Sequence, residues 1–293
     1  MGKWLAQVML SLMLSTAGFG LHSPDPHALP SVGVGDTRVA VQGTAPASFA
    51  VQAKAALLMD LHSGVELYGK NTDVELPMAS LTKLMTGYVI LKHHALDDVV
   101  TIGPAVATVG GDSQRLNIRE GEQFTVRELM KGLLIYSAND VAVALASWDA
   151  GTEQAFVDKM NNTARELGMS HTKFANASGL DAEGHHSTAK DLSVIARIML
   201  ESETVRSVVK LSSASMRTVS GKSYPMTTTN RLLTQNSEVQ GLKTGYTLNA
   251  GECLIAYGVS GRKRALSVVL NSPDRFQESD SLIHLALDRI SIQ

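Results

Sequence analysis

The chain has 293 residues, which is enough to bury a full core and excludes a peptide hormone or a linker. Hydrophobic residues make up 44% of it and charged residues 18%, as is typical of an ordinary globular protein. The formal net charge is −2, so the balance of charges does not suggest a nucleic-acid partner. These values fit one large domain or two small ones.

The first twenty residues have the order of a secretory signal peptide. One lysine is followed by an apolar run from Trp4 to Leu14 and then by small residues, with Gly18-Phe19-Gly20 as an imperfect cleavage site. An uncleaved anchor helix is the alternative, but the run is short for a membrane span and contains polar residues. We therefore predict residues 1–20 as a signal peptide and an exported protein in the periplasm or the cell-wall space.

The next segment, residues 21–52, is rich in Pro, Gly, Ala and Ser and shows no sustained period. Such a composition predicts a flexible spacer. After it, the apolar run 53–61, a turn at His62-Ser63-Gly64 and the segment 65–70 predict a β-hairpin. Folded structure is therefore expected from residue 53 onward.

Residues 96–200 are predicted as a mostly helical insert. Two segments, TVRELMKGLLIYSANDVAVALASWDA and TEQAFVDKMNNTARELGM, carry apolar residues three and four apart, and Thr188 with Asp191 caps a further helix. Strand patterns then return in GLKTGYT, GECLIAYGV and ALSVVLNS. Strands at both ends of a helical block indicate an α+β fold whose N- and C-terminal parts share one antiparallel sheet.

The single cysteine, Cys253, lies in one of these strands, in the apolar run CLIAYGV. A buried strand position is therefore expected for it, not a reactive thiol. One cysteine cannot form an internal disulfide, and a chain with so little cysteine suits an oxidising compartment.

Between the hairpin and the insert, the stretch PMASLTKLMTG places Ser80 three residues before Lys83. On a helix, both side chains would lie on one face within hydrogen-bonding reach. Ser80 would also sit in the first turn, where free N–H groups and the helix dipole stabilise an oxyanion. A lysine, with an ordinary pKa of about 10.4, acts as a base only if desolvation or a neighbouring cation lowers that pKa. The site therefore needs a second positive group.

Lys243-Thr244-Gly245, on a predicted strand, offers that group. Lys243 can lower the pKa of Lys83 and attract an anionic substrate, Thr244 offers a hydroxyl to a carboxylate, and Gly245 lets a substrate backbone approach the strand. Within the insert, Ser137 can relay a proton and Asn139 can hold a substrate amide.

Each of these motifs alone occurs by chance, and Ser80 alone would be interpreted as a helix N-cap. The order S-x-x-K, S-x-N, K-T-G, with each motif at an element boundary, favours a catalytic site. At this point the chain resembles the penicillin-recognising serine peptidases, and within them the low-molecular-weight D-alanyl-D-alanine carboxypeptidases. The resemblance covers about residues 53–290 and extends to the stretch Met160 to Leu192. It implies a β-lactamase/DD-peptidase-like fold, with residues 53–293 as the catalytic domain.

The resemblance also implies roles for the residues of the first two motifs. Ser80 would be the acylated nucleophile and Lys83 its base. Ser137 would pass the proton to the leaving amine, and Asn139 would bind the peptide. The implied partners are peptidoglycan stem peptides or cross-links and β-lactams, with inhibition by penicillin.

The third motif would bind the other end of the substrate. Lys243 and Thr244 would hold the terminal carboxylate beside Gly245, and the backbone N–H of Tyr246 would complete the oxyanion hole with that of Ser80. An arginine that helps bind this carboxylate in some relatives has an uncertain counterpart here, for which Arg275 is the candidate.

The sequence departs from the larger members of the family at its end. Those members have a second, β-rich domain and a C-terminal amphipathic anchor, whereas this sequence stops after its last helix, like the branch that includes periplasmic endopeptidases. The apolar residues of ESDSLIHLALDRI fall on one helical face, so we expect them to cover the sheet: Leu282, Ile283, Leu285, Ala286 and Ile290. A mature chain without a membrane anchor is predicted.

Two other functions stay open. A β-lactamase of class A would need a glutamate between the second and third motifs, where Glu183 lies without the expected surrounding pattern. A non-catalytic sensor of muropeptides or β-lactams would not need an activated nucleophile, whereas Lys83 and Lys243 are both retained.

The sequence predicts neither a metal nor a cofactor. His185 and His186 lie near Asp181 and Asp191, but in a glycine-flanked segment without ligand spacing, which favours an ordinary surface loop. Gly221-Lys222-Ser223 lacks the upstream glycine of a phosphate loop. A G-x-S-x-G elbow is absent from the sequence, which disfavours a Ser-His-Asp hydrolase.

Overall fold

The computed structural model describes residues 39–41, 51–111 and 113–292, all within the unit Asp36–Gln293. The predicted signal peptide, residues 1–20, lies outside the described residues. Among the described residues, none of the helices has both the length and the apolar character to cross a membrane.

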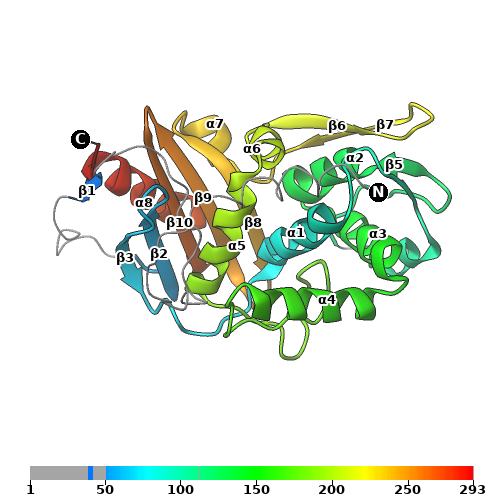
Figure 1. The fold of residues 1–293 in the computed structure, drawn as a ribbon, viewed down its shortest axis with the longest axis horizontal. Coiled ribbons are helices and arrows are strands. Elements are labelled where there is room, and N and C mark those ends of the chain that lie inside the picture. Colours follow the sequence, from blue (N-terminus) through cyan, green and yellow to red (C-terminus); the bar gives the residue numbers. More distant parts are fainter. Residues whose placement is uncertain (1–38, 42–50, 112, 293) are drawn as a thin grey trace, which may run out of the picture. The chain divides into compact units, whose positions relative to one another are not determined.

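A five-stranded antiparallel sheet joins the two ends of the described chain (Figure 1). The predicted hairpin forms β2 (Ala55–Asp60) and β3 (Glu66–Lys70), and β2 pairs with β10 (Lys263–Ser272). The order continues through β9 (Gly251–Ser260) to β8 (Val239–Thr247), which forms the other edge. The prediction of one α+β sheet shared by the N- and C-terminal parts is therefore confirmed.

Both faces of this sheet are buried, and successive residues point to opposite cores as the pleat requires. On β2, Leu57 and Met59 join the core shared with the helical insert, whereas Ala56 and Leu58 join the second core. Cys253 on β9 is fully buried in the first core, as its apolar run predicted. In Figure 1 the helical insert lies on one side of the sheet and the C-terminal helix on the other.

The C-terminal helix, α8 (Arg275–Arg289), packs against β9, β10 and β2. Leu282, Ile283 and Ala286 are buried there and Leu285 is partly buried, as the apolar face predicted. Ile290 differs from the prediction because the helix ends at Arg289 and Ile290 begins β11 (Ile290–Ile292).

The insert is mostly helical but also contains strands that the periodicity did not reveal. Its helices pack with α1 (Lys83–His93), which precedes residue 96, and are α2 (Val126–Lys131), α3 (Asn139–Ala150), α4 (Glu153–Glu166), α5 (Ala189–Glu201) and α6 (Glu203–Val209). Two short strands pair within it, β4 (Val99–Thr101) and β5 (Gln123–Thr125). The predicted end at residue 200 is early, since α6 and the hairpin β6 (Ser213–Arg217) and β7 (Ser223–Thr227) follow before α7 (Leu232–Gln235) and β8.

Four of the described helices begin at a residue whose side chain caps them. Thr125, Thr152, Thr188 and Ser202 each accept a hydrogen bond from a backbone N–H of the first helical turn, at α2, α4, α5 and α6. The predicted cap of Thr188 with Asp191 is one of these.

Of the segment predicted as a spacer, residues 21–52, the structure describes residues 39–41 and 51–52. Val39–Val41 form β1, which pairs antiparallel with β11 at the other end of the chain. A run of three apolar residues is too short to distinguish a strand from a linker in the sequence.

Candidate active site

The S-x-x-K motif lies where a 3-10 turn passes directly into α1. The turn, η1, spans Ala79–Thr82, and Lys83 is the first residue of α1. Ser80 therefore precedes the α-helix and does not lie in its first turn. The spacing of three residues still places the lysine side chain next to the serine. Lys83 Nζ lies 2.9 Å from Ser80 Oγ.

Lys83 is fully buried, and three oxygens surround its amine. Besides Ser80 Oγ, the amine donates to Asn139 Oδ1 at 2.6 Å and to the backbone carbonyl of Ser178. Burial lowers the pKa of Lys83 from 10.5 to about 7, and the Asp140 carboxylate acts in the opposite direction. At neutral pH a substantial fraction of Lys83 is therefore an uncharged amine.

The S-A-N motif joins a π-helical turn, η3 (Gly132–Tyr136), to α3. Ser137 adopts a left-handed conformation with φ of 65°, and the chain reverses there so that Asn139 begins α3. The Asn139 backbone N–H donates to the Gln114 carbonyl at 2.8 Å, and its side chain reaches Lys83. Ser137 and Asn139 are both buried at one wall of a cleft that they share with Ser80.

The K-T-G motif lies on β8, against η1. A Cβ atom on Gly245 would lie 3.0 Å from the Met78 carbonyl oxygen and 3.1 Å from the Ser80 nitrogen. Glycine is thus needed for contact between β8 and the turn that carries Ser80, which differs from the predicted reason, the approach of a substrate backbone. Because β8 is the edge of its sheet, half of its backbone N–H and C=O groups face away from β9.

Burial is the largest cause of the lowered pKa at both lysines of the site, Lys83 and Lys243. Burial lowers the pKa of Lys243 well below its ordinary value, and the charges of Lys83 and Arg275 lower it further. Repulsion between two amines is reciprocal, so a charge on either lysine disfavours a charge on the other. Desolvation is therefore the main cause of the lowered pKa of Lys83, and the contribution that the sequence predicted for Lys243 stays a prediction.

The three motifs meet at one cleft of about 750 Å³. Of the predicted residues, those that line it are Ser80, Ser137, Asn139, Thr244, Gly245 and Tyr246, and Arg275 lines it too. Lys83 and Lys243 are fully buried and do not line the cleft. Arg275, at the start of α8, donates from Nη1 to the Gly245 carbonyl at 2.7 Å.

Comparisons with known proteins agree with this geometry. The family model of the D-alanyl-D-alanine carboxypeptidases, peptidase family S11, matches residues 40–274. The chain belongs to this family.

Several relatives of the S11 chain are known. The D-alanyl-D-alanine carboxypeptidase DacF of Bacillus subtilis is 37% identical over 237 residues, which is 78% of this chain and 60% of DacF. The chain thus spans about 60% of the length of the first curated relatives it matches. The D-alanyl-D-alanine carboxypeptidase of Streptomyces sp. strain K15 is 33% identical and 85% covered. The crystal structure of the Streptomyces K15 DD-transpeptidase superposes with a TM-score of 0.76 at 30% identity, over 82% of this chain and 98% of that one.

Sequence reasoning missed one part of the site in this S11 domain, the segment 174–187, which we call the cradle loop. Its Ser178 carbonyl accepts a hydrogen bond from Lys83, and Thr86 Oγ1 donates to its Ala177 carbonyl at 2.7 Å. Gly179, Leu180 and Asp181 line the cleft. Backbone carbonyls leave no residue signature, so the sequence could indicate this contribution only through the glycines of the loop.

The histidines of the cradle loop also differ from the prediction of an ordinary surface loop. His185 is only 6% exposed, and its ring contacts Thr82 Oγ1 and the Ala175 backbone N–H. His186 is more exposed and pairs with Glu75 at 3.5 Å. Within the described residues, acidic, histidine and cysteine side chains nowhere gather in a group of three that could hold a metal ion.

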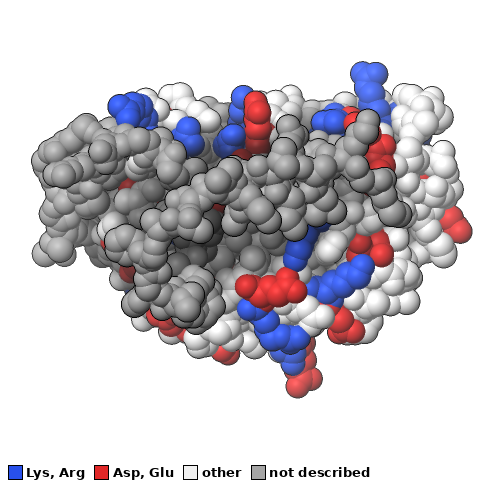
Figure 2. Space-filling view, viewed as in Figure 1, with Lys and Arg blue, Asp and Glu red and all other residues white. Residues whose placement is uncertain are grey.

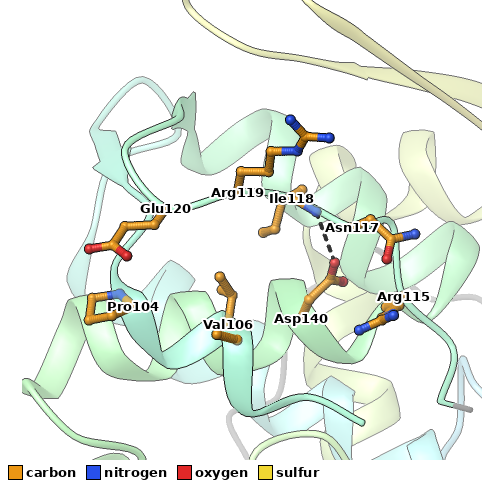
Figure 3. Close-up of a pocket in the computed structure, with 9 residues that line it drawn as sticks. Pro104, Val106, Arg115, Asn117, Ile118, Arg119, Glu120 and Asp140 are labelled. Atoms are coloured by element: carbon orange, nitrogen blue, oxygen red, sulfur yellow. Dashed lines mark hydrogen bonds between the residues drawn. The ribbon is translucent and has the colours of Figure 1, made fainter. Parts of the chain in front are cut away.

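A second pocket, of about 400 Å³, lies behind the S-A-N motif (Figure 3). Its walls are η2 (Pro104–Thr108) and residues 115–120, and Asp140 of α3 lies at its base. The Asp140 carboxylate accepts hydrogen bonds from the backbone N–H groups of Leu116, Ile118 and Val141. This carboxylate therefore anchors the strand-like segment that carries Gln114 to the cleft, and its hydrogen-bonding capacity is used within the protein.

The surface seen in Figure 2 carries charges of both signs. Among the described residues on that face, Lys and Arg side chains lie beside Asp and Glu side chains and do not form one large patch of a single sign.

Proposed function

We propose that this protein is a serine peptidase that acts on the D-Ala-D-Ala part of peptidoglycan stem peptides or on their cross-links, through an acyl-enzyme on Ser80. The observation that carries the proposal is the buried Lys83 amine in contact with Ser80 Oγ. The family membership and the names of the relatives support the same reaction class.

The contacts of Lys83 fix the direction in which a proton can move. Asn139 Oδ1 and the Ser178 carbonyl can only accept hydrogen bonds, so they take both hydrogens of a neutral amine. The nitrogen lone pair then faces Ser80 Oγ, 2.9 Å away, and can accept the hydroxyl proton as the oxygen attacks a carbonyl carbon. Lys83 would thus act as the general base of acylation.

The cleft offers groups for the rest of the substrate. Ser137, which faces the cleft with Ser80, would carry the proton to the leaving amine, and Asn139 would bind the peptide amide. The backbone N–H groups of Ser80 and Tyr246, on the adjacent segments η1 and β8, would bind the oxyanion. Thr244 Oγ1, which lies 2.5 Å from Thr229 Oγ1, would receive the terminal carboxylate.

Lys243 and Arg275 would complete the carboxylate site. A substrate carboxylate beside Lys243 would raise the pKa of its amine again, so that the lysine gains its charge together with the ligand. The buried Nε of Arg275 has no hydrogen-bond partner among the described residues, although its Nη1 holds the Gly245 carbonyl.

One observation argues against the β-lactamase alternative. Glu183, the glutamate that could activate a deacylating water, is exposed and does not line the cleft among the described residues. Among the described residues, Asp181 is the acidic residue that lines the cleft, and its carboxylate accepts hydrogen bonds from Thr247 Oγ1 and the Asn249 N–H. An acyl-enzyme formed with a β-lactam would then lack a free carboxylate base for rapid hydrolysis, and penicillin would act as an inhibitor.

The proposal is tested with penicillin and with a pentapeptide substrate. Intact-mass measurement should show one penicillin adduct, absent in Ser80→Ala, and the wild-type protein should release D-alanine from the pentapeptide. Lys83→Ala should slow acylation about 10²–10⁴-fold through loss of the base. A non-catalytic sensor would bind penicillin but release no D-alanine, and an adduct that persists in Ser80→Ala would refute the assignment of the nucleophile.

The site of action is part of the same proposal. We infer export to the periplasm or the cell-wall space from the sequence of residues 1–20. Cell fractionation should recover processed protein outside the cytoplasm, and digestion of purified dimer muropeptides should show cleavage of cross-links. Unprocessed protein in the cytoplasm would contradict export. Dimer muropeptides that stay intact while monomeric pentapeptides lose D-alanine would contradict cleavage of cross-links.

A further inference from the structure

The cradle loop lies directly against the turn that carries Ser80. A Cβ atom on Gly179 would lie 2.0 Å from the Ala79 carbonyl oxygen and 2.9 Å from the Ser80 nitrogen. The loop is closed at its base by paired backbone hydrogen bonds between Lys173 and His186. The closed loop therefore lies in contact with the peptide bond between Ala79 and Ser80.

His185 reaches the same turn from the base of the loop. Its Nδ1 accepts a hydrogen bond from the Ala175 backbone N–H at 2.9 Å, and its Nε2 lies 2.8 Å from Thr82 Oγ1. Because a backbone N–H can only donate, Nδ1 carries no proton, and a neutral imidazole must carry its proton on Nε2. His185 thus donates to Thr82, and Thr82 Oγ1 donates in turn to the Ala79 carbonyl at 2.8 Å.

This chain of hydrogen bonds ends on a peptide whose orientation matters for the proposed chemistry. In a trans peptide the carbonyl and the next N–H point in opposite directions, so the contact that fixes the Ala79 oxygen also fixes the Ser80 N–H. Ala79 has φ of 49°, a left-handed conformation that is costly for alanine and persists only where its surroundings hold it.

The other proposed oxyanion donor is held in a comparable way. Arg275 donates to the Gly245 carbonyl at 2.7 Å, which belongs to the same peptide as the Tyr246 N–H. Each of the two N–H donors is therefore opposite a carbonyl that accepts a hydrogen bond from a side chain, Thr82 Oγ1 in one case and Arg275 Nη1 in the other.

We propose that His185 is a positioning residue for Ser80: through Thr82 it holds the Ala79–Ser80 peptide so that the Ser80 N–H points to the oxyanion. This inference rests on the proposed function. It goes beyond that proposal because His185 neither contacts Lys83 or Ser80 in the hydrogen-bond network nor lines the cleft.

The proton arrangement that the proposal needs is stable at neutral pH. Burial lowers the pKa of His185 from 6.5 to about 4; His186 and Lys83 act in the same direction and Asp181 in the opposite one. The Phe174 ring packs at its edge, 6.0 Å between centroids, and adds no charge. His185 therefore stays neutral where the enzyme would work.

The test compares acylation by benzylpenicillin in five single variants and one double variant, with the rate constant of acylation separated from the dissociation constant of the initial complex. Thr82→Val keeps the shape of the side chain and removes both hydrogen bonds, whereas Thr82→Ser keeps the hydroxyl. His185→Ala removes the donor, and His185→Gln can restore an N–H toward Thr82. His186→Gln is the control, since this neighbouring histidine is outside the chain of hydrogen bonds.

We expect Thr82→Val and His185→Ala to lower the acylation rate constant about tenfold or more, because small misplacements of reacting groups have effects of this size. The dissociation constant should change less than twofold. Thr82→Ser should keep the wild-type rate, His185→Gln should recover part of it, and His186→Gln should match wild type. Combined, His185→Ala and Thr82→Val should slow acylation no more than the worse single change, because they interrupt one chain.

Thermal unfolding of each variant separates positioning from folding. Thr82→Val and His185→Ala variants that lower the melting temperature but acylate at the wild-type rate would overturn the inference. If His185→Ala fails to fold, the comparison of Thr82→Val with Thr82→Ser decides alone, and equal rates in that pair would also overturn it. A wild-type protein that forms no adduct at Ser80 would refute the proposed function itself, and this inference with it.

Discussion

At the scale of single residues, burial sets the chemistry of this site more than neighbouring charge does. The sequence suggested that Lys243 lowers the pKa of Lys83, which is a reasonable inference from two lysines in one site. Both amines are fully buried, however, and desolvation alone is the largest cause of both pKa shifts. Burial depends on the packed fold and cannot be read from the spacing of two motifs.

The pKa of Lys83 predicts how acylation depends on pH. The base is the neutral amine, and its pKa in the folded protein is lowered to about 7, so lowering the pH below 7 protonates it. The second-order rate constant of acylation by penicillin should fall about tenfold per pH unit below that value and level off above it. Acylation rate constants measured by stopped flow or by mass spectrometry between pH 5 and 9 would check this. A rate constant that still rises tenfold per pH unit up to pH 9 would contradict it, because the base would then have an ordinary lysine pKa.

Cys253 provides a second test of burial. Burial raises the pKa of its thiol to about 11, which outweighs the opposing charge of Arg275. At pH 8 about a thousandth of this thiol is thiolate, so alkylation should be slow in the native protein and rapid in urea. Cys253→Val should leave penicillin acylation nearly unchanged. Rapid alkylation of the native protein at pH 8 would show that the thiol is accessible.

At the scale of elements, the sequence predicted those whose pattern is long and those whose chemistry is distinctive. The hairpin of β2 and β3, the strands β8, β9 and β10, and the helix α8 all carry sustained periods, and the structure has them. The short strands β1, β4 and β5 have three residues each, too few for alternation to be distinguished from chance.

The sequence predicted the side chains of the candidate site but not its backbone contacts. Ser80, Ser137, Asn139 and Thr244 were found because their side chains belong to short motifs, and the structure places all four on one cleft. The cradle loop was missed because it acts through backbone carbonyls and a buried histidine. Its contacts join segments about a hundred residues apart, and only the folded chain brings these together.

At the scale of elements, the close packing of the cradle loop against the Ser80 turn can be tested by substitution. Gly179→Ala should both destabilise the protein and slow acylation, because its Cβ would clash with the Ala79 backbone and displace the Ser178 carbonyl from Lys83. Overpacking of this kind costs about 1–3 kcal/mol or more. Melting temperature and acylation rate constant would be measured together.

Gly184→Ala, in the same loop, is the matched control. Gly184 also has a left-handed φ, 72° against 88° for Gly179, so both substitutions share the backbone strain. A Cβ on Gly184, however, would meet only the flexible end of Lys173, at 3.3 Å. Equal effects of the two substitutions would mean that the close approach of Gly179 to the Ser80 turn has no consequence of its own.

At the scale of the whole molecule, the two faces of the sheet support different parts of the protein. One face supports the insert, whose helices carry Lys83 and Asn139, and the other face is covered by α8. Arg275 begins α8 and reaches back to the Gly245 carbonyl at the cleft. The packing of α8 on the sheet should therefore affect both the stability of the fold and the position of Arg275.

The packing of α8 on β9 at Gly258 predicts a specific clash. A Cβ on Gly258 of β9 would lie 2.3 Å from Ile283 Cγ2. Replacing a strand glycine by alanine gains about 0.5–1 kcal/mol from the unfolded chain, whereas overpacking costs about 1–3 kcal/mol. Gly258→Ala should therefore be destabilising overall, as measured by the free energy of unfolding in urea.

The partner substitution shows whether the clash is the cause. Ile283→Ala alone removes buried apolar atoms and should cost about 2–5 kcal/mol. It also removes the atoms nearest to the new Cβ, so Gly258→Ala should cost less in that background, or become stabilising. Gly69→Ala on β3 is the control, because its Cβ would meet first the movable carboxylate of Glu66. Additive effects of Gly258→Ala and Ile283→Ala would show that α8 does not press on β9 at this point, and that the helix is free to shift away from the sheet.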